Sequence, residues 1–258
     1  MLLTAVIITK NEECRIRKCL NSLKDWVDEV ILVDDGSTDS TINIAREEYG
    51  TKIIHSISEG NFDKQRNLGI DAAAGEWILQ MDADEIIPSQ TAGVIREAIA
   101  TPSDYAGYHL RMQFCIFDFP LKHLKQANAL KLFKKNKAKY IGRKIHETLD
   151  IQGKLGYLNA TIMHYNNVSV QSSLEKYNFY TDVEARAYLE QHNLISLKAL
   201  KKEMLSKTLR RFFKHYFKNN GYKDGIHGLI WCLINTIMPL MFWLKVAELA
   251  LKQDKISK

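Results

Sequence analysis

The first hundred residues alternate short apolar runs with segments whose apolar residues recur at helical spacing. Apolar runs at residues 2–8, 29–33 and 77–81, and a shorter one at 52–55, are typical of buried strands. Between them, residues 14–23, 40–48 and 61–74 have the pattern of helices. Because strand and helix alternate with short loops, the pattern predicts an α/β domain with a mostly parallel sheet flanked by helices.

The later part of the chain changes character. A helix is expected between residues 86 and 104, followed by strand-like stretches at 105–117, 130–134, 140–148 and 160–166. Residues 172–193 and 196–219 then have helical spacing. We therefore expect an α/β domain over residues 1–170 and a helical C-terminal extension over residues 171–258.

Charge separates the same two parts. Residues 1–100 contain 18 Asp and Glu against 10 Lys and Arg, whereas residues 101–258 contain 12 against 26. The basic rear part suits nucleic acid or an anionic membrane surface. The four cysteines have no metal-binding or disulfide spacing, so we expect reduced thiols in a cytosolic protein. The first apolar run lacks a basic flank and turns polar at Thr9, which indicates a strand rather than a signal peptide.

Three of the predicted strands end in polar side chains of types that bind ligands. These are Asn11 and Glu12, Asp34 and Asp35, and Asp82 and Asp84. In open α/β sheets, ligands bind at the carboxyl ends of the strands. Two carboxylates separated by one residue suit Mg²⁺ or Mn²⁺, which is typically held together with substrate phosphates. The alternatives are an acidic, solvated turn after the fourth strand and a helix cap after the second.

Four stretches resemble family-2 glycosyltransferases in their order and spacing. They are Ala5-Val-Ile-Ile-Thr-Lys-Asn-Glu, Val33-Asp-Asp-Gly-Ser-Thr-Asp-Ser-Thr, Gln65-Arg-Asn-Leu-Gly and Gly75-Glu-Trp-Ile-Leu-Gln-Met-Asp-Ala-Asp-Glu. Further stretches, Lys144-Ile-His-Glu and Gly221-Tyr-Lys-Asp-Gly-Ile-His-Gly-Leu, resemble a narrower group that adds sugars to the inner core of lipopolysaccharide or lipooligosaccharide. The resemblance implies a GT-A (Rossmann-like) fold, a nucleotide-diphosphate sugar donor, a divalent metal and inversion at the anomeric carbon. Residues 1–100 would form the nucleotide-binding part and residues 101–170 the acceptor side.

The resemblance also implies roles for single residues. Thr9, Asn11 and Glu12 would border the nucleotide, and Asp34 or Asp35 would hold the base or the ribose. Lys64, Arg66 and Asn67 would lie near the nucleotide or the diphosphate. Asp84 would be the principal metal ligand, and Asp82 would touch the metal or the ribose. His164 is a further candidate ligand, with a structural histidine as the alternative. Glu147 would be the base that takes the proton of the acceptor hydroxyl, or else a surface ion-pairing residue.

The rear of the chain predicts membrane association. Residues 198–223 contain nine Lys and Arg, one acid (Glu203) and apolar residues at helical spacing, which is typical of a helix on an anionic membrane surface. Residues 228–244 have no charged side chain and would span about 25 Å as a helix, slightly less than a hydrocarbon core. A membrane span, an interfacial insertion and a helix packed on protein all remain open. We expect attachment through residues 198–251 to the cytoplasmic face of the inner membrane, and no nucleic-acid partner.

Together these features predict a metal-dependent, inverting hexosyltransferase of lipopolysaccharide biosynthesis, with UDP-glucose as the favoured donor and a glycolipid acceptor. The alternatives are a polyprenyl-phosphate glycosyltransferase, a nucleotidyltransferase and a non-catalytic membrane assembly partner. The oligomeric state is left open, with a homo-oligomer among the options.

Overall fold

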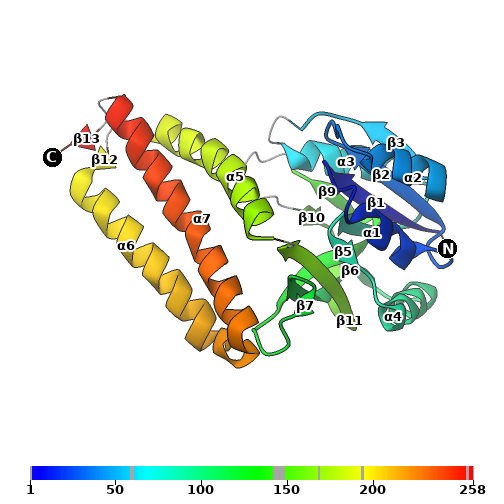
Figure 1. Cartoon of the computed structure of the whole chain (residues 1–258). Coiled ribbons are helices and arrows are strands. Elements are labelled where there is room, and N and C mark those ends of the chain that lie inside the picture. The colour runs from blue at the N-terminus through cyan, green and yellow to red at the C-terminus, as the bar shows by residue number, and fades with distance from the viewer. Residues whose placement is uncertain are drawn as a thin grey trace. The chain divides into compact units, whose positions relative to one another are not determined.

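A computed structural model describes residues 2–58, 61–141, 149–167, 169–192, 195–253 and 256–257 (Figure 1). The chain forms two compact units, each described by itself below. The first, the sheet unit, comprises Met1–Gln113 and Gln126–His164. The second, the helical unit, comprises Phe114–Lys125 and Tyr165–Lys258.

The sheet unit is built on one mixed sheet. Its strands follow the order β3 (Lys52–His55), β2 (Glu29–Asp34), β1 (Leu3–Thr9), β4 (Trp77–Asp82), β8 (Ala127–Lys134), β6 (Tyr105–Ile116), β11 (Lys154–Asn167) and β5 (Glu85–Ile86). The first four strands are parallel to one another, whereas β8 pairs antiparallel with both β4 and β6, and β5 pairs antiparallel with β11. A separate antiparallel pair joins β9 (Ala138–Tyr140) to β10 (Leu149–Ile151).

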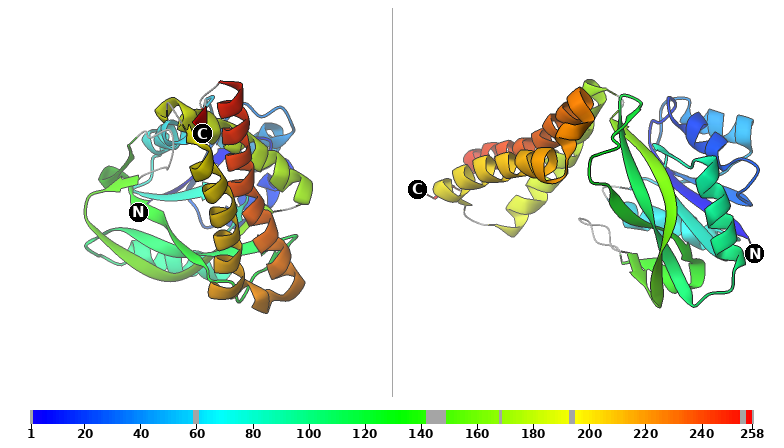
Figure 2. Two further views of the ribbon diagram at one scale, coloured as in Figure 1. Left: turned by 90° about the vertical axis from the view of Figure 1, so that its left-hand side faces the viewer. Right: turned by 90° about the horizontal axis from the view of Figure 1, so that it is seen from below.

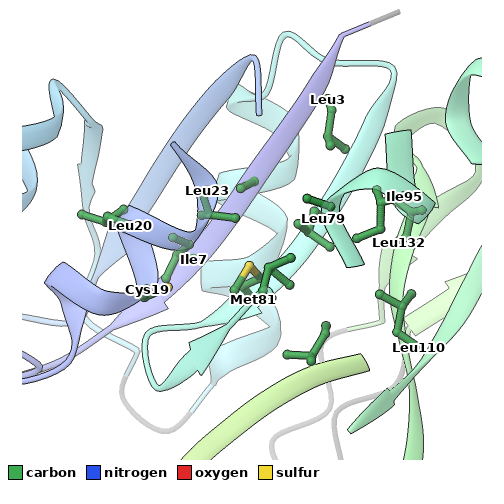
Figure 3. Packing of buried hydrophobic residues seen from close by; sticks show 14 of the residues in the cluster. Leu3, Ile7, Cys19, Leu20, Leu23, Leu79, Met81, Ile95, Leu110 and Leu132 are labelled. Atoms are coloured by element: carbon green, nitrogen blue, oxygen red, sulfur yellow. The ribbon is translucent and has the colours of Figure 1, made fainter. Parts of the chain in front are cut away.

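Helices cover both faces of this sheet. They are α1 (Ile16–Leu23), α2 (Thr41–Tyr49), α3 (Phe62–Ala72) and α4 (Ser89–Ala100). Successive side chains of β1 point to opposite faces, as the period of a strand requires. Leu3, Ala5 and Ile7 pack with α1, α2 and α4, whereas Val6 packs with α3. Figure 3 shows the first of these cores, where residues of α1 meet those of β1 and β4.

Local sequence explains where these helices begin and end. The side chain of Asn61 accepts a hydrogen bond from the backbone N–H of Lys64 and so caps α3. Gly50 ends α2 in the left-handed conformation, with φ of 60°. On α3, Gly69 lies so close to β1 that an added Cβ would be 2.3 Å from Cγ1 of Val6. Only glycine allows α3 to approach the sheet this closely.

The helical unit contains three long helices, α5 (Val170–Gln191), α6 (Leu197–Phe213) and α7 (Gly225–Lys252). A π-helical turn, Lys214–Lys218, and a 3-10 turn, Gly221–Asp224, connect α6 to α7. Helix α7 continues through Pro239 and packs against both α5 and α6 (Figures 1 and 2). By length and composition alone, Gly221–Lys252 is also apolar enough to cross a membrane.

Short elements complete the helical unit. Strand β7 (Phe119–Pro120) pairs with the end of β6, and the two-residue strands β12 (Ile195–Ser196) and β13 (Ile256–Ser257) pair with each other. The carboxylate of Asp224 accepts hydrogen bonds from the backbone N–H groups of His123 (3.0 Å) and Leu124 (2.7 Å). The segment Phe114–Lys125 is thereby fixed to the start of α7.

The predicted fold class is confirmed: a sheet flanked by helices is followed by a helical C-terminal extension. The second half of the sheet is antiparallel, because β6 and β8 follow one another without the helical crossover that parallel pairing requires.

Candidate functional site

The ends of β1, β2 and β4 lie together at one edge of the sheet. Thr9, the last residue of β1, is in register with Asp34 of β2, and its neighbour Ile8 is in register with Asp82 of β4. Within the described part of the chain, the Oγ1 atom of Thr9 is buried and has no hydrogen-bond partner. This edge therefore gathers the residues that the sequence suggested for ligand binding.

The loops after β1 and β2 hold each other in place. Asn11 adopts a left-handed backbone, with φ of 52°, and its Oδ1 atom accepts a hydrogen bond from the N–H of Thr38 at 2.8 Å. The N–H of Asn11 donates to Oγ of Ser37 at 2.9 Å, and the N–H of Glu12 donates to Oγ1 of Thr41 at 2.7 Å. Asn11 therefore joins the loop after β1 to the loop after β2 through both its backbone N–H and its side-chain amide.

The two carboxylates after β2 have different surroundings. Asp34 accepts hydrogen bonds from the backbone N–H groups of Gly36 (3.2 Å) and Ser37 (3.1 Å), and it shapes the turn in which Gly36 has φ of 77°. Asp35 instead joins separate segments. It accepts hydrogen bonds from the N–H of Ser58 at 2.5 Å and from Nε2 of Gln65 at 3.1 Å. Asp34 thus shapes the turn that precedes α2, which is not the helix-capping role that the sequence suggested as the alternative; the N–H of Thr41 in the first turn of α2 donates to Asp39 instead.

A charged cluster follows β4. Asp82 is about one-third exposed, with Oδ1 3.5 Å from Arg66 and Oδ2 3.3 Å from Nζ of Lys131. Asp84 is buried, with Oδ1 3.3 Å from Nε2 of His164 and Oδ2 3.9 Å from Arg15. Each carboxylate of this pair therefore lies between two basic side chains.

The third carboxylate, Glu85, is buried and is bound by Lys131. Nζ of Lys131 lies 2.7 Å from Oε1 and 2.8 Å from Oε2 of Glu85, and Oε2 also accepts a hydrogen bond from the N–H of Asp82 at 3.0 Å. Lys131 belongs to β8, Asp82 ends β4 and Glu85 begins β5, so three strands meet at the ammonium group of Lys131.

Burial and charge oppose each other in this cluster. Burial by itself would raise the pKa of Asp82, but the charges of Lys131 and Arg66 lower that pKa. Burial would lower the pKa of His164, but its hydrogen bond to Asp84 and the nearby carboxylates raise it. Burial raises the pKa of Glu85 despite the opposing charge of Lys131. The cluster is a dense, alternating set of charges, of the kind that gathers at active sites.

A family model described as "Glycosyl transferase family 2" matches residues 4–160, more than half of the chain. The chain belongs to glycosyltransferase family 2. The predicted family and the prediction of an enzyme are thereby confirmed. The match includes Asp82, Asp84, Glu85 and Lys131, whereas His164 lies four residues beyond its end.

Relatives cover nearly the whole of this glycosyltransferase. An uncharacterized glycosyltransferase of Rickettsia typhi is 29% identical over 273 residues, covering 98% of this chain and 89% of the relative. The lipopolysaccharide core biosynthesis glycosyltransferase LpsC of Rhizobium meliloti is 22% identical over 258 residues, covering 95% and 92%. Among solved structures, S. aureus TarS 1–349 in complex with UDP-GlcNAc has a TM-score of 0.45 and 16% identity, covering 100% of this chain and 93% of that chain. That TM-score is too low to add to what the family model shows.

The donor atoms of the cluster are compatible with a divalent cation. Strand β11 places His164 opposite Glu85 of β5, and this pairing brings the imidazole to Asp84. Among the described residues, no three His, Cys, Asp or Glu side chains are arranged to hold a metal ion by themselves. Mg²⁺ and Mn²⁺ do not need such a set, because they are commonly bound by one or two carboxylates together with substrate phosphates. In this glycosyltransferase Asp84 and His164 could supply the protein ligands.

Other predicted residues lie around α3. Arg66 is buried, and its guanidinium lies 5.4 Å from the ring centre of Tyr140. Asn67 donates to the backbone carbonyl of Tyr140 (2.8 Å) and accepts from its N–H (3.0 Å), so its amide holds β9. Lys64 is exposed on the first turn of α3. Glu147, the expected base, lies outside the described residues.

Lys131, Glu85 and Arg15 also belong to the cluster, although they were not among the predicted site residues. Lys131 had a recognisable signal, because it is the one charged residue between Leu130 and Phe133 in an apolar strand. A lysine in such a run is buried only when it has a partner. That partner is Glu85, which lies 46 residues earlier in the Asp82-Ala-Asp-Glu85 stretch.

Proposed function

We propose that this glycosyltransferase moves a hexose, with UDP-glucose as the favoured donor, onto a glycolipid such as the inner core of lipopolysaccharide, with inversion at the anomeric carbon. The observation that carries the proposal is the charged cluster at the carboxyl edge of the parallel strands. The relative LpsC, named for lipopolysaccharide core biosynthesis, supports the class of acceptor.

The residues of the cluster have complementary roles in this proposal. Asp84 and His164 would hold a divalent cation, whose charge would stabilise the diphosphate leaving group. Arg66 would add positive charge close to that leaving group. Lys131 pairs with Asp82 and Glu85 and so fixes these two carboxylates in position before the donor binds.

In the reaction, an acceptor oxygen forms a bond to the anomeric carbon while the bond from that carbon to the diphosphate oxygen breaks. The nucleoside diphosphate leaves, and the proton of the acceptor hydroxyl goes to a carboxylate base. Glu147 remains our candidate for that base. Replacement of Glu147 by Gln should reduce turnover while donor binding is retained.

To test the proposal, the enzyme is incubated with UDP-glucose, Mn²⁺ and a purified core glycolipid that lacks its outer sugars. The mass of the product is then measured by mass spectrometry. A gain of one hexose that disappears with EDTA is expected. Transfer to polyprenyl phosphate instead of the core glycolipid would favour the alternative acceptor. Release of pyrophosphate from UTP and a sugar phosphate would identify a nucleotidyltransferase and overturn the proposal.

A further inference from the structure

Helix α6 and the turn after it expose a row of large apolar side chains. Leu205, Leu209, Phe213 and Phe217 recur every four residues and are 67%, 55%, 53% and 55% exposed. Residues four apart lie on the same face of a helix. The rings of Phe213 and Phe217 stack with their centres 5.8 Å apart. We call these four residues the α6 stripe. A continuous exposed row of this kind marks an interaction surface.

Basic side chains surround the α6 stripe. Residues 198–218 contain eight Lys and Arg and a single acid, Glu203, which is 2.8 Å from Lys207. Two of these cations, Lys202 and Arg210, are exposed. Lys202 lies three residues before Leu205, and Arg210 directly follows Leu209. A second copy of the chain would bring two such positive surfaces together, which is unfavourable. An anionic bilayer attracts them, at about 1 kcal/mol for each Lys or Arg near its surface.

Helix α6 also runs along α7. Near one end of α7, Phe212 and Tyr216 pack beside the buried Trp231. Near the other end, Leu200 and Met204 pack beside the buried Trp243. Between these contacts, Nζ of Lys207 lies 4.9 Å from the ring centre of Trp243. The views in Figures 1 and 2 agree that α6 and α7 lie side by side.

This packing decides what α7 can do. If α7 crossed a bilayer in this arrangement, α6 would enter the hydrocarbon core beside it. Each Lys or Arg near the bilayer centre costs about 2.5–3.5 kcal/mol, so even half of the eight cations would cost on the order of 10 kcal/mol. In addition, Lys245 of α7 forms an ion pair with Asp182 of α5 at 2.8 Å. Only 28% of the most apolar stretch of α7 is buried, so the case against a span rests on these charged contacts rather than on burial.

We infer that the helical unit binds one leaflet of an anionic membrane, with the α6 stripe inserted among the lipids and α7 kept out of the hydrocarbon core. Interfacial helices of this type bury their apolar face about 5–10 Å into the boundary between headgroups and acyl chains. The inference deepens the proposed function, because a glycolipid acceptor lies in such a surface. It is tested without donor or acceptor, so its failure would leave the proposed transfer reaction untouched.

The test is co-sedimentation of the full chain with vesicles of phosphatidylcholine alone and of phosphatidylcholine with one-quarter phosphatidylglycerol. We expect binding to the anionic vesicles that falls at least tenfold in 0.5 M NaCl, and little binding to the neutral ones. The double variant Leu209→Ser with Phe213→Ser should bind at least tenfold more weakly. The matched control, Phe179→Ser with Val183→Ser, changes two exposed apolar residues of α5 and should stay within twofold. Circular dichroism checks that both variants are folded.

Three results would overturn the inference. The first is equal loss of binding in the stripe variant and the control. The second is retention in the membrane after an alkaline carbonate wash, which would show that α7 spans. The third is a concentration-dependent dimer that the stripe variant abolishes, with no vesicle binding by the unaltered chain.

Discussion

Removal of the Lys131 ammonium should destabilise the sheet unit strongly. Glu85 is only 1% exposed, and both of its carboxylate oxygens lie within 2.8 Å of Nζ of Lys131. Breaking a buried ion pair by removing one partner costs about 3–5 kcal/mol, because the other charge remains buried and uncompensated. The contact between Lys131 and Asp82 adds little, since Asp82 is one-third exposed and water screens it. We therefore expect Lys131→Met to lower the free energy of unfolding by about 3–5 kcal/mol.

Urea denaturation followed by circular dichroism measures this loss, and a second substitution tests its cause. Adding Glu85→Gln to Lys131→Met removes the uncompensated charge and should restore at least half of the lost stability. The matched control is Lys139→Met, an exposed lysine of β9, which should change stability by less than about 0.5 kcal/mol. A loss below about 1 kcal/mol for Lys131→Met, or no recovery in the double variant, would show that an uncompensated charge on Glu85 does not destabilise the sheet unit.

Three further predictions concern the site, the core and the helical unit. Asp84→Asn should reduce turnover by roughly 10²–10³-fold with the fold retained, whereas Asp104→Asn, at an exposed position, should leave turnover unchanged. Gly69→Ala should lower the free energy of unfolding by about 1–3 kcal/mol, because the added Cβ would overlap the side chain of Val6. Burial, aided by neighbouring cations, lowers the pKa of His215 below its ordinary value near 6.5. The unfolded chain therefore binds a proton at His215 more readily than the folded chain does. The free energy of unfolding should fall as the pH drops from the pKa of His215 in the unfolded chain to its pKa in the folded chain. His215→Gln should reduce this fall, as measured by melting at a series of pH values.

The parallel half of the sheet could be predicted because its signals are local. Each strand is a continuous apolar run, and each following helix has its own periodicity, so β1, β2 and β4 could be placed within a residue of their observed ends. The common edge of their carboxyl ends then follows from the parallel topology.

The rest depends on contacts between residues far apart in the sequence. Lys131 and Glu85 are 46 residues apart, and nothing around either residue shows that they meet. Asp34 and Asp35 are adjacent in sequence, and the contacts of Asp35 with Ser58 and Gln65, which lie 23 and 30 residues away along the chain, help to distinguish them. The apolar composition of α7 suits a membrane span and a core helix equally well, and only 28% of its most apolar stretch is buried. The inference that α7 does not span rests on the basic helix α6 packed along it.

Calorimetric titration of UDP-glucose into the full chain, with Mn²⁺ and with EDTA, tests whether the charged cluster binds a nucleotide-sugar donor. We expect saturable binding that requires the metal and is lost in Asp84→Asn but kept in Asp104→Asn. Screening other UDP-, GDP-, CMP- and ADP-sugars in the same way would identify a different donor if UDP-glucose fails. No metal-dependent binding of any nucleotide sugar by the folded protein would contradict the assignment of the charged cluster as the donor site.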